Sequence, residues 1–114
     1  MKLEKKLPFL RKEGHLDEQK VYKISKIADG FERGKFGDEL RITLVDDSGN
    51  EFIYAAWQKD VNKLIDAFGD ETDTWIGVQL GVKAVMSKNR ENKDVMIWEI
   101  SPNITDGITE KLGQ

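Results

Sequence analysis

Cysteine is absent from this chain of 114 residues, and histidine occurs only once, as His15. Without cysteine the chain can form no disulfide, no thiolate metal site and no cysteine nucleophile. One histidine in an irregular N-terminal stretch is too few for a histidine-based metal site or a catalytic triad. The acidic clusters fall in a tight turn and at a helix exit, where turn formation and capping account for them. We therefore expect no catalytic residue, no metal and no cofactor, and the sequence predicts that this protein is not an enzyme.

Long apolar runs are also missing from the sequence. We therefore expect no membrane span, and the N-terminus lacks the apolar core of a signal peptide. These absences favour a cytoplasmic location without a membrane partner. The length is that of a single domain with one modest hydrophobic core.

Acidic residues outnumber basic ones by 21 to 18, which gives a formal net charge of −3. The excess is concentrated in residues 46–77, which carry eight Asp/Glu against two Lys/Arg. Local field matters more than net charge, so a basic face elsewhere is compatible with this balance. We expect the acidic residues of 46–77 to form one side of the molecule, opposite or beside a more basic cleft.

Alternating apolar and polar residues predict strands over most of the chain. In residues 21–28 the alternation slips by one residue, which predicts a β-bulge. Residues 39–46 form a regular strand with apolar side chains on one face. The turn DDSGN, residues 46–50, leads into a partner strand over residues 51–57.

Two registers are possible for this hairpin. If Gly49 supplies the positive φ of a type I turn with a bulge, Ile53 and Trp57 lie on the outer face of the sheet. A four-residue loop would instead send Phe52 and Tyr54 outward, because a shift of one residue exchanges the two faces. We favour the first register.

In residues 57–69 the apolar spacing changes from that of a strand to that of a helix. One stripe, predicted to be buried, contains Val61, Leu64, Ile65 and Phe68. Gly69 stands where a helix would end in a glycine cap. A short helical turn follows and ends at Gly77, and we expect Trp75 and Ile76 to pack inward from it. Two further strands, residues 78–86 and 93–101, are joined by a polar hairpin loop.

The order strand, strand, strand, helix, strand, strand is that of the five-stranded OB barrel. The predicted fold class is therefore mainly β, a five-stranded OB-fold barrel with one α-helix between strands three and four. The helix would close one end of the barrel. We divide the chain into an N-terminal lead-in segment (1–19), the OB-fold domain (20–102) and a polar C-terminal tail (103–114).

Three strings carry a family resemblance: DDSGN followed by EFIYAAW, NKLIDAFGDETDTWIG, and the N-terminal LPFLRKEGHLDEQKVYKI. Through them the chain resembles, from about Val21 to Pro102, the OB-fold single-stranded-DNA-binding proteins. The similarity is to the replication-protein-A-like kind and to the small single-domain kind of phages and archaea. The resemblance implies the fold and the lineage more than a particular activity.

An OB barrel binds nucleic acid across the face of strands two and three, between the loops that join strands one–two and four–five. Single-strand binding needs cations near the phosphates and flat side chains on which bases stack. Both loops of this chain are basic or aromatic. The predicted nucleic-acid-binding residues are Arg33, Lys35, Phe36, Arg41, Trp57, Lys88, Arg90 and Lys93. Polar hairpins also carry Lys and Arg for solubility alone, and that interpretation stays open.

The function that these observations favour is binding of single-stranded nucleic acid, DNA more than RNA, with little sequence preference. The expected partners are single-stranded DNA or RNA and replication or recombination proteins. An alternative is an OB-fold protein–protein interaction subunit of a replication, recombination or phage assembly. A third is an enzyme or a binder of small anionic or sugar ligands. We expect Trp75 in the core and favour the core for Trp98, whereas Trp57 fits either the core edge or a stacking platform.

Overall fold

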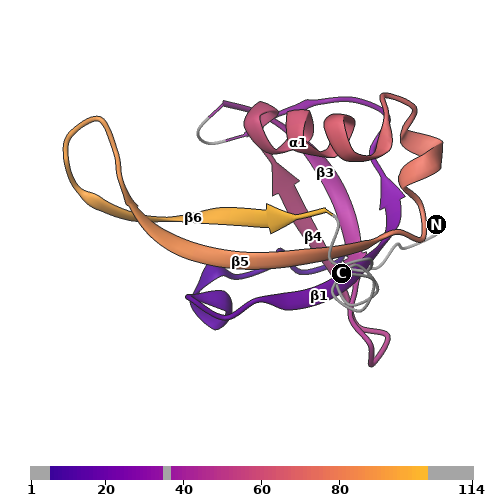
Figure 1. Ribbon diagram of the computed structural model, residues 1–114, viewed down its shortest axis with the longest axis horizontal. Helices are drawn as coiled ribbons and strands as arrows, with labels where there is room; N and C mark the ends of the chain where they lie inside the picture. The colour runs from indigo at the N-terminus through magenta and orange to yellow at the C-terminus, as the bar shows by residue number, and fades with distance from the viewer. Residues whose placement is uncertain (1–5, 35–36, 103–114) are drawn as a thin grey trace, which may run out of the picture.

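The computed structural model describes residues 6–34 and 37–102, so the tail predicted for residues 103–114 lies outside the described residues. The described part is mainly β and consists of six strands, one α-helix and two short 3-10 helices, η1 and η2 (Figure 1). In chain order the elements are η1 (Lys12–His15), β1 (Lys20–Ile27), β2 (Glu32–Gly34), β3 (Gly37–Val45), β4 (Glu51–Ala56), α1 (Gln58–Phe68), η2 (Thr72–Trp75), β5 (Gln79–Lys88) and β6 (Asp94–Ser101). None of the described helices is long and apolar enough to cross a bilayer.

All six strands belong to one antiparallel sheet in which β1 is central. β1 pairs with β3 on one side and with β5 on the other, β3 also pairs with β2 and β4, and β5 pairs with β6. The pairing of β1 with β3 shifts between Ile24 and Lys26, which confirms the predicted bulge. A bulge bends its strand and increases the local twist, so it allows β1 to serve both halves of the sheet.

The β3–β4 hairpin has the register that the glycine turn predicts. Ile42 lies opposite Tyr54 and Thr43 opposite Ile53, and Gly49 has a φ of +87°. Within the turn, the Asp46 carboxylate accepts the backbone N–H groups of Ser48 and Asn50. These hydrogen bonds, chiefly those of Asn50, lower the pKa of Asp46 below its ordinary value. The apolar face of β3, the aromatic ring of Tyr54 and the residues opposite them on β1 and β5 form the core.

The helix α1 lies across one end of the sheet and covers the core there (Figure 1). Val61 and Leu64 are buried, whereas Ile65 and Phe68 are half-buried and pack against the core from its margin. The predicted stripe therefore faces the core, but only two of its four residues are fully buried. Gly69 ends the helix at a φ of +90° and donates its N–H to the Ile65 carbonyl.

The segment after α1 corrects one expectation. Trp75 is buried and its Nε1 donates to the Gly69 carbonyl at 2.9 Å, but Ile76 is 48% exposed rather than packed inward. The backbone is extended at Ile76, and successive side chains of an extended chain point to opposite sides. Because Trp75 takes the inward position, Ile76 faces outward.

The structure also corrects the expectation of a closed, five-stranded barrel. Residues 32–34 of the first loop form the extra strand β2, and β4 and β6 do not pair within the described part of the chain. The free edge of β4 is taken instead by the lead-in segment. Leu10 N–H donates to the Ile53 carbonyl, Ile53 N–H donates to the Pro8 carbonyl, and both distances are 2.8 Å. An edge that is already hydrogen-bonded to another segment cannot pair with β6.

The lead-in segment is anchored by His15, which is buried. Its Nδ1 lies 2.7 Å from the Arg11 carbonyl oxygen and its Nε2 lies 2.6 Å from the Tyr22 hydroxyl oxygen. Because a carbonyl can only accept, Nδ1 carries the proton, and neutral Nε2 accepts the bond that the Tyr22 hydroxyl donates. Burial lowers the pKa of His15 below its ordinary value of 6.5.

We expect the protein to lose stability between neutral and mildly acidic pH, and the loss to depend on His15. The unfolded chain binds a proton on this ring near pH 6.5, whereas the folded chain binds it only at lower pH. The contribution of His15 to the free energy of unfolding is therefore complete above pH 6.5. It is lost as the pH falls through 6.5 toward the pKa that His15 has in the folded protein. Urea unfolding at a series of pH values measures this dependence.

The variant His15→Gln, which cannot titrate, is expected to flatten the pH profile in this window. His15 is the only histidine of the chain, so no other histidine can produce the same profile. A variant whose stability falls as steeply as that of the parent would contradict the assignment.

Candidate nucleic-acid interface

A groove of about 160 Å³ follows the open seam between β4 and β6. β4 contributes Ile53 and Ala55, which are outer-face residues in the observed register. The lead-in segment lines another side with Phe9 and Lys12. The open seam between β4 and β6 is thus a surface to which three separate parts of the chain contribute. We call it the seam groove.

Aromatic side chains surround the seam groove. Trp57, at the start of α1, is 41% exposed, and Phe9 is 50% exposed. Trp98 of β6 is half-buried, with its ring centroid 6.0 Å from that of Tyr54 and the two planes nearly perpendicular. The Lys12 ammonium lies 5.6 Å from the Trp98 ring centroid. Of the two tryptophans that the sequence left open, Trp57 is therefore the exposed one, and Trp98 forms part of the wall.

A buried pair beneath the seam groove holds α1 against β4. The Tyr54 hydroxyl donates to Asp60 Oδ2 at 2.7 Å, and both side chains are buried. Burial, and then the negative charge of Asp60, raise the pKa of Tyr54 well above its ordinary value of 10. Tyr54 therefore stays protonated and keeps donating this bond. Asp60 is three residues after Trp57, so the same bond fixes the first turn of α1 beside the groove.

Arg41 occupies the outer face of β3, as predicted, but two carboxylates lie beside its guanidinium. Its guanidinium is 2.9 Å from Glu32 and 3.6 Å from Glu39. The guanidinium carbon also lies 5.3 Å from the ring centroid of Phe9, a cation–π distance. Arg41 therefore supports the lead-in segment at the margin of the groove, and a phosphate would compete with two carboxylates for it.

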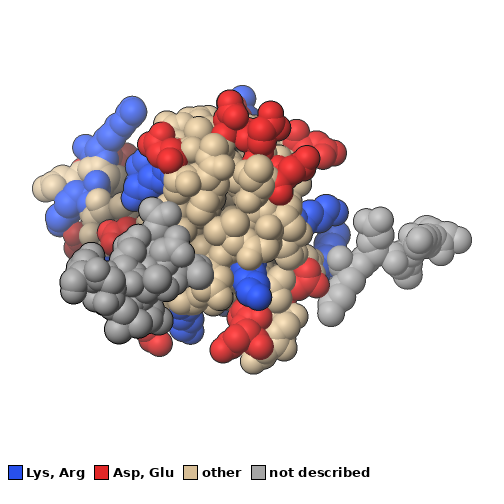
Figure 2. All heavy atoms as spheres, turned by 45° about the vertical axis from the view of Figure 1, so that its right-hand side comes forward, with Lys and Arg blue, Asp and Glu red and all other residues tan. Residues whose placement is uncertain are grey.

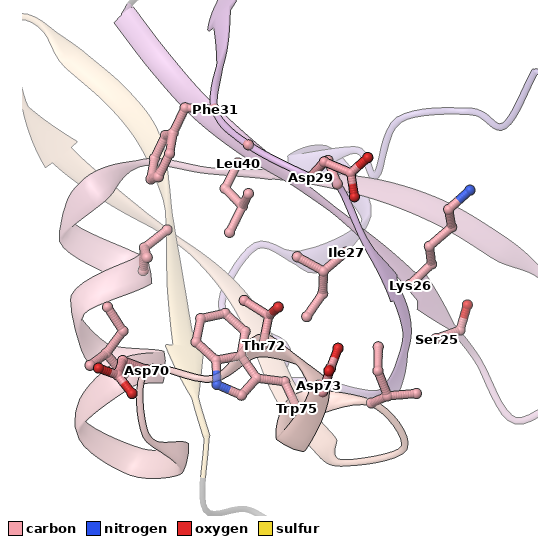
Figure 3. A pocket seen from close by; sticks show the side chains of 15 residues that line it. Ser25, Lys26, Ile27, Asp29, Phe31, Leu40, Asp70, Thr72, Asp73 and Trp75 are labelled. Carbon is pink, nitrogen blue, oxygen red and sulfur yellow. The ribbon is translucent and has the colours of Figure 1, made fainter.

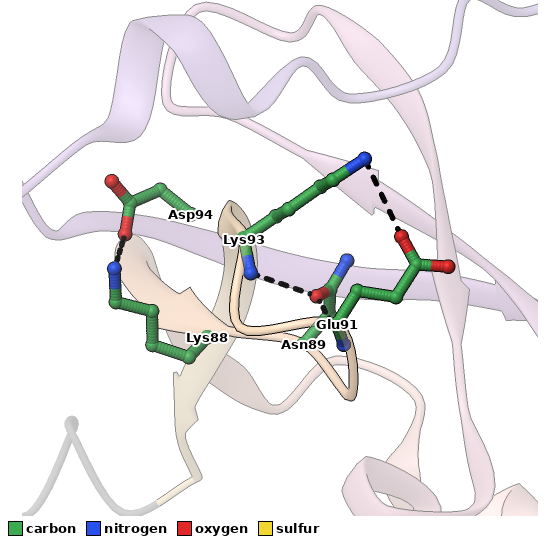
Figure 4. Close-up of polar contacts among 5 residues, drawn as sticks. All are labelled: Lys88, Asn89, Glu91, Lys93 and Asp94. Carbon is green, nitrogen blue, oxygen red and sulfur yellow. Dashed lines mark hydrogen bonds and ion pairs between the residues drawn. The ribbon is translucent and has the colours of Figure 1, made fainter.

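The predicted cations of the second loop lie in the β5–β6 hairpin, which extends beyond the rest of the sheet (Figure 1). Lys88 is 2.5 Å from Asp94, and Lys93 is 3.5 Å from Glu91 (Figure 4). The Asn89 side chain accepts the backbone N–H of Lys93 and shapes the turn. Exposed ion pairs of this kind are weak, so the hairpin lysines are partly neutralised but still able to exchange partners.

Neither Arg33 nor Arg90 lines the groove. Arg33 is exposed on β2, and Arg90 is exposed at the hairpin tip. No ion pair, hydrogen bond or ring contact among the described residues joins the hairpin to Arg33 or Arg41. Lys35 and Phe36 lie outside the described residues. Of the predicted set, the structure places Trp57 on the groove and Arg41 at its margin.

The structure also corrects the expectation that the acidic residues of 46–77 form one side of the molecule. The DDSGN turn follows the pair Val45–Glu51, and α1 begins just after the pair Leu40–Ala56, so the hairpin separates the two acidic groups. Figure 1 shows the turn and α1 at opposite ends of the sheet. Acidic side chains gather along the edge formed by α1 and the segment after it (Figure 2).

Of the residues that line the seam groove, only Trp57 was in the predicted set, which therefore missed the aromatic Phe9 and the cations Lys12 and Lys59. Phe9 and Lys12 lie in a segment without periodicity, and the only signal there is an apolar cluster, LPFL.

Comparison with protein-family models, curated proteins and solved structures found no match to this chain. The chemistry of the seam groove is therefore what indicates a function.

Proposed function

We propose that the protein binds single-stranded nucleic acid, DNA in preference to RNA, in the seam groove. The observation that carries this proposal is the exposed ring of Trp57 beside Phe9 and Trp98 on one groove. Aromatic faces of this kind stack on bases of any sequence, each stacked base contributing roughly 1–3 kcal/mol. Lys12 and Lys59 on the same groove supply positive charge for the phosphates.

We further propose that the chain is a variant of the OB fold, related to the single-stranded-DNA-binding proteins that its sequence resembles. The support is the pairing pattern, in which β1 pairs with β3 and β5, β3 with β4, and β5 with β6, with α1 between β4 and β5. In an OB barrel the second and third strands form the binding face. β3 and β4 take those positions here, and the seam groove lies along them, with the lead-in segment in the place of barrel closure.

The charge pattern predicts how such binding depends on salt. Arg41, Lys88 and Lys93 each lie beside a carboxylate with which a phosphate would compete, so each would release fewer counterions than an unpaired cation. Each phosphate neutralised on a single strand contributes roughly 0.7 to the salt slope. We therefore expect a shallow slope, with stacking as the larger part of the affinity.

A titration tests the proposal directly. A mixed-sequence single-stranded DNA oligonucleotide is added to the full chain at two salt concentrations, and tryptophan fluorescence is followed. We expect quenching, because a base that stacks on Trp57 changes the environment of its ring. The same strand as a duplex should bind more weakly, since its bases are already stacked, and an RNA strand of the same sequence measures the DNA preference. Absence of binding at low salt would contradict the proposal.

A second candidate is a protein–protein interaction subunit of a replication, recombination or phage assembly. The observation that favours it is a separate apolar hollow with two exposed large side chains, Phe31 and Ile76. This surface does not depend on nucleic-acid binding.

A further inference from the structure

A second hollow, of about 570 Å³, lies between α1 and the end of β1 (Figure 3). Its lining includes Ile65 of α1, Ile27 of β1 and Trp75 of η2. We call it the acidic hollow, for the carboxylates described below. The acidic hollow and the seam groove share no lining residue, so they are separate surfaces.

Two large apolar side chains of the acidic hollow are exposed to solvent. Phe31 is 44% exposed and Ile76 is 48% exposed, and both line it. Ile27, Ala28 and Ile65 also line it and are half-buried. Contiguous apolar surface inside a polar rim is typical of interaction sites. Two exposed large apolar side chains that line one hollow are therefore better explained by a partner than by chance exposure.

The rim of this hollow is acidic. Asp29, Asp70 and Asp73 line it, against one cation, Lys26 (Figure 3). Within the described residues none of the three carboxylates forms an ion pair. Residues 66–82 contain four acidic residues and no Lys or Arg, so this side of the hollow carries only negative charge. The acidic hollow consequently attracts cations and repels phosphate groups.

We propose that the acidic hollow is the docking site for a short, basic, amphipathic peptide segment of a partner protein. Apolar side chains of that segment enter between Phe31 and Ile76, and its Lys or Arg residues pair with Asp29, Asp70 and Asp73. Charge excludes the other occupants. Nucleic acid would bring phosphates against three carboxylates, and a symmetric contact with a second copy would bring the acidic rim against itself.

The experiment selects peptides with the full-length protein as bait. A phage-displayed library of random peptides is panned against the parent, and the enriched peptides are synthesised and measured by fluorescence anisotropy. We expect enriched peptides to combine apolar residues with a net positive charge and to bind less tightly as salt rises. Binding to Ile76→Lys should be weaker by about tenfold or more, because that variant removes an apolar side chain from the contact and adds a like charge.

A matched variant separates the acidic hollow from general surface effects. Met86 is another exposed apolar residue, 52% exposed on β5 and absent from the lining of the hollow. Met86→Lys makes the same kind of change, and it should leave peptide binding as in the parent. Replacing Asp70 and Asp73 together by asparagine should remove most of the salt dependence, whereas Asp47→Asn in the distant turn should not.

Four outcomes would overturn the proposal. In the panning, these are the absence of any enriched peptide and the enrichment of peptides without net positive charge. In the binding measurements, they are equal peptide affinity for the Ile76→Lys and Met86→Lys variants and tighter peptide binding after deletion of residues 103–114. The last would make the chain's own C-terminal segment the occupant. Sedimentation adds a fifth, because a dimer that Ile76→Lys converts to a monomer would identify a second copy instead. None of these outcomes bears on nucleic-acid binding at the seam groove, which is measured separately.

Discussion

Replacing Leu64 with alanine is expected to lower the free energy of unfolding by about 2–5 kcal/mol. The Leu64 side chain has no exposed surface and lies in the core cluster, where α1 covers one end of the sheet. Alanine would remove buried apolar surface and leave a cavity that the strands around it can fill only in part. Alanine is at least as good a helix former as leucine, so the loss would come from packing and not from the helix itself. Chemical denaturation followed by circular dichroism measures it.

The neighbouring substitution Ile65→Ala is the control. It removes a side chain of the same size from the same helix, but Ile65 is only half-buried at the margin of the core. We expect it to cost less than half as much as Leu64→Ala. Equal losses would mean that α1 is packed with a different face toward the sheet.

Replacing Trp57 with alanine is expected to weaken single-strand binding by roughly 1–3 kcal/mol, the contribution of one stacked base. Trp57 is the exposed aromatic that begins α1 and lines the seam groove, and alanine offers no surface for stacking. The salt slope should stay nearly unchanged, because no cation is removed. Fluorescence anisotropy of a labelled oligonucleotide measures both quantities, and circular dichroism confirms that the variant is folded.

Two further variants make this result specific. Phe31→Ala removes an aromatic of similar exposure, 44% against 41%, from the acidic hollow, and it should leave nucleic-acid binding unchanged. Arg90→Ala should lower the salt slope by roughly 0.7 if the hairpin tip meets a phosphate, with only a small loss at high salt. If Trp57→Ala binds like the parent while Phe31→Ala does not, nucleic acid binds at the other surface.

The two proposed surfaces differ in charge. The seam groove has aromatic rings, two lysines (Lys12, Lys59) and two carboxylates (Glu39, Asp60), whereas the acidic hollow has three carboxylates and one lysine around apolar side chains. The acidic hollow would therefore repel an anionic strand more strongly than the seam groove. The net charge of −3 is therefore compatible with nucleic-acid binding, because the acidic excess gathers at α1, at the segment after it and in the DDSGN turn.

The local features of this protein follow from its sequence alone. Alternation predicted every strand except the short β2, and it predicted the bulge of β1. Gly49 predicted the register of the β3–β4 hairpin, because a positive φ selects the turn and the turn sets the pairing. The helical spacing from Val61 predicted α1 and its buried stripe. These features depend on residues that are close together in the chain, so periodicity and turn chemistry determine them.

Only the tertiary structure decided which distant segments meet. No local pattern in LPFL indicates that this stretch takes the free edge of β4, leaves the seam to β6 open and brings Phe9 and Lys12 to the same groove as Trp57. Nor does the spacing of charges reveal that Arg41, Lys88 and Lys93 lie beside carboxylates. Periodicity tells which face of an element is apolar. It does not tell which element covers that face or which charges become neighbours. Both depend on competition among strand edges that are far apart in the chain, and that competition is resolved only when the whole sheet assembles.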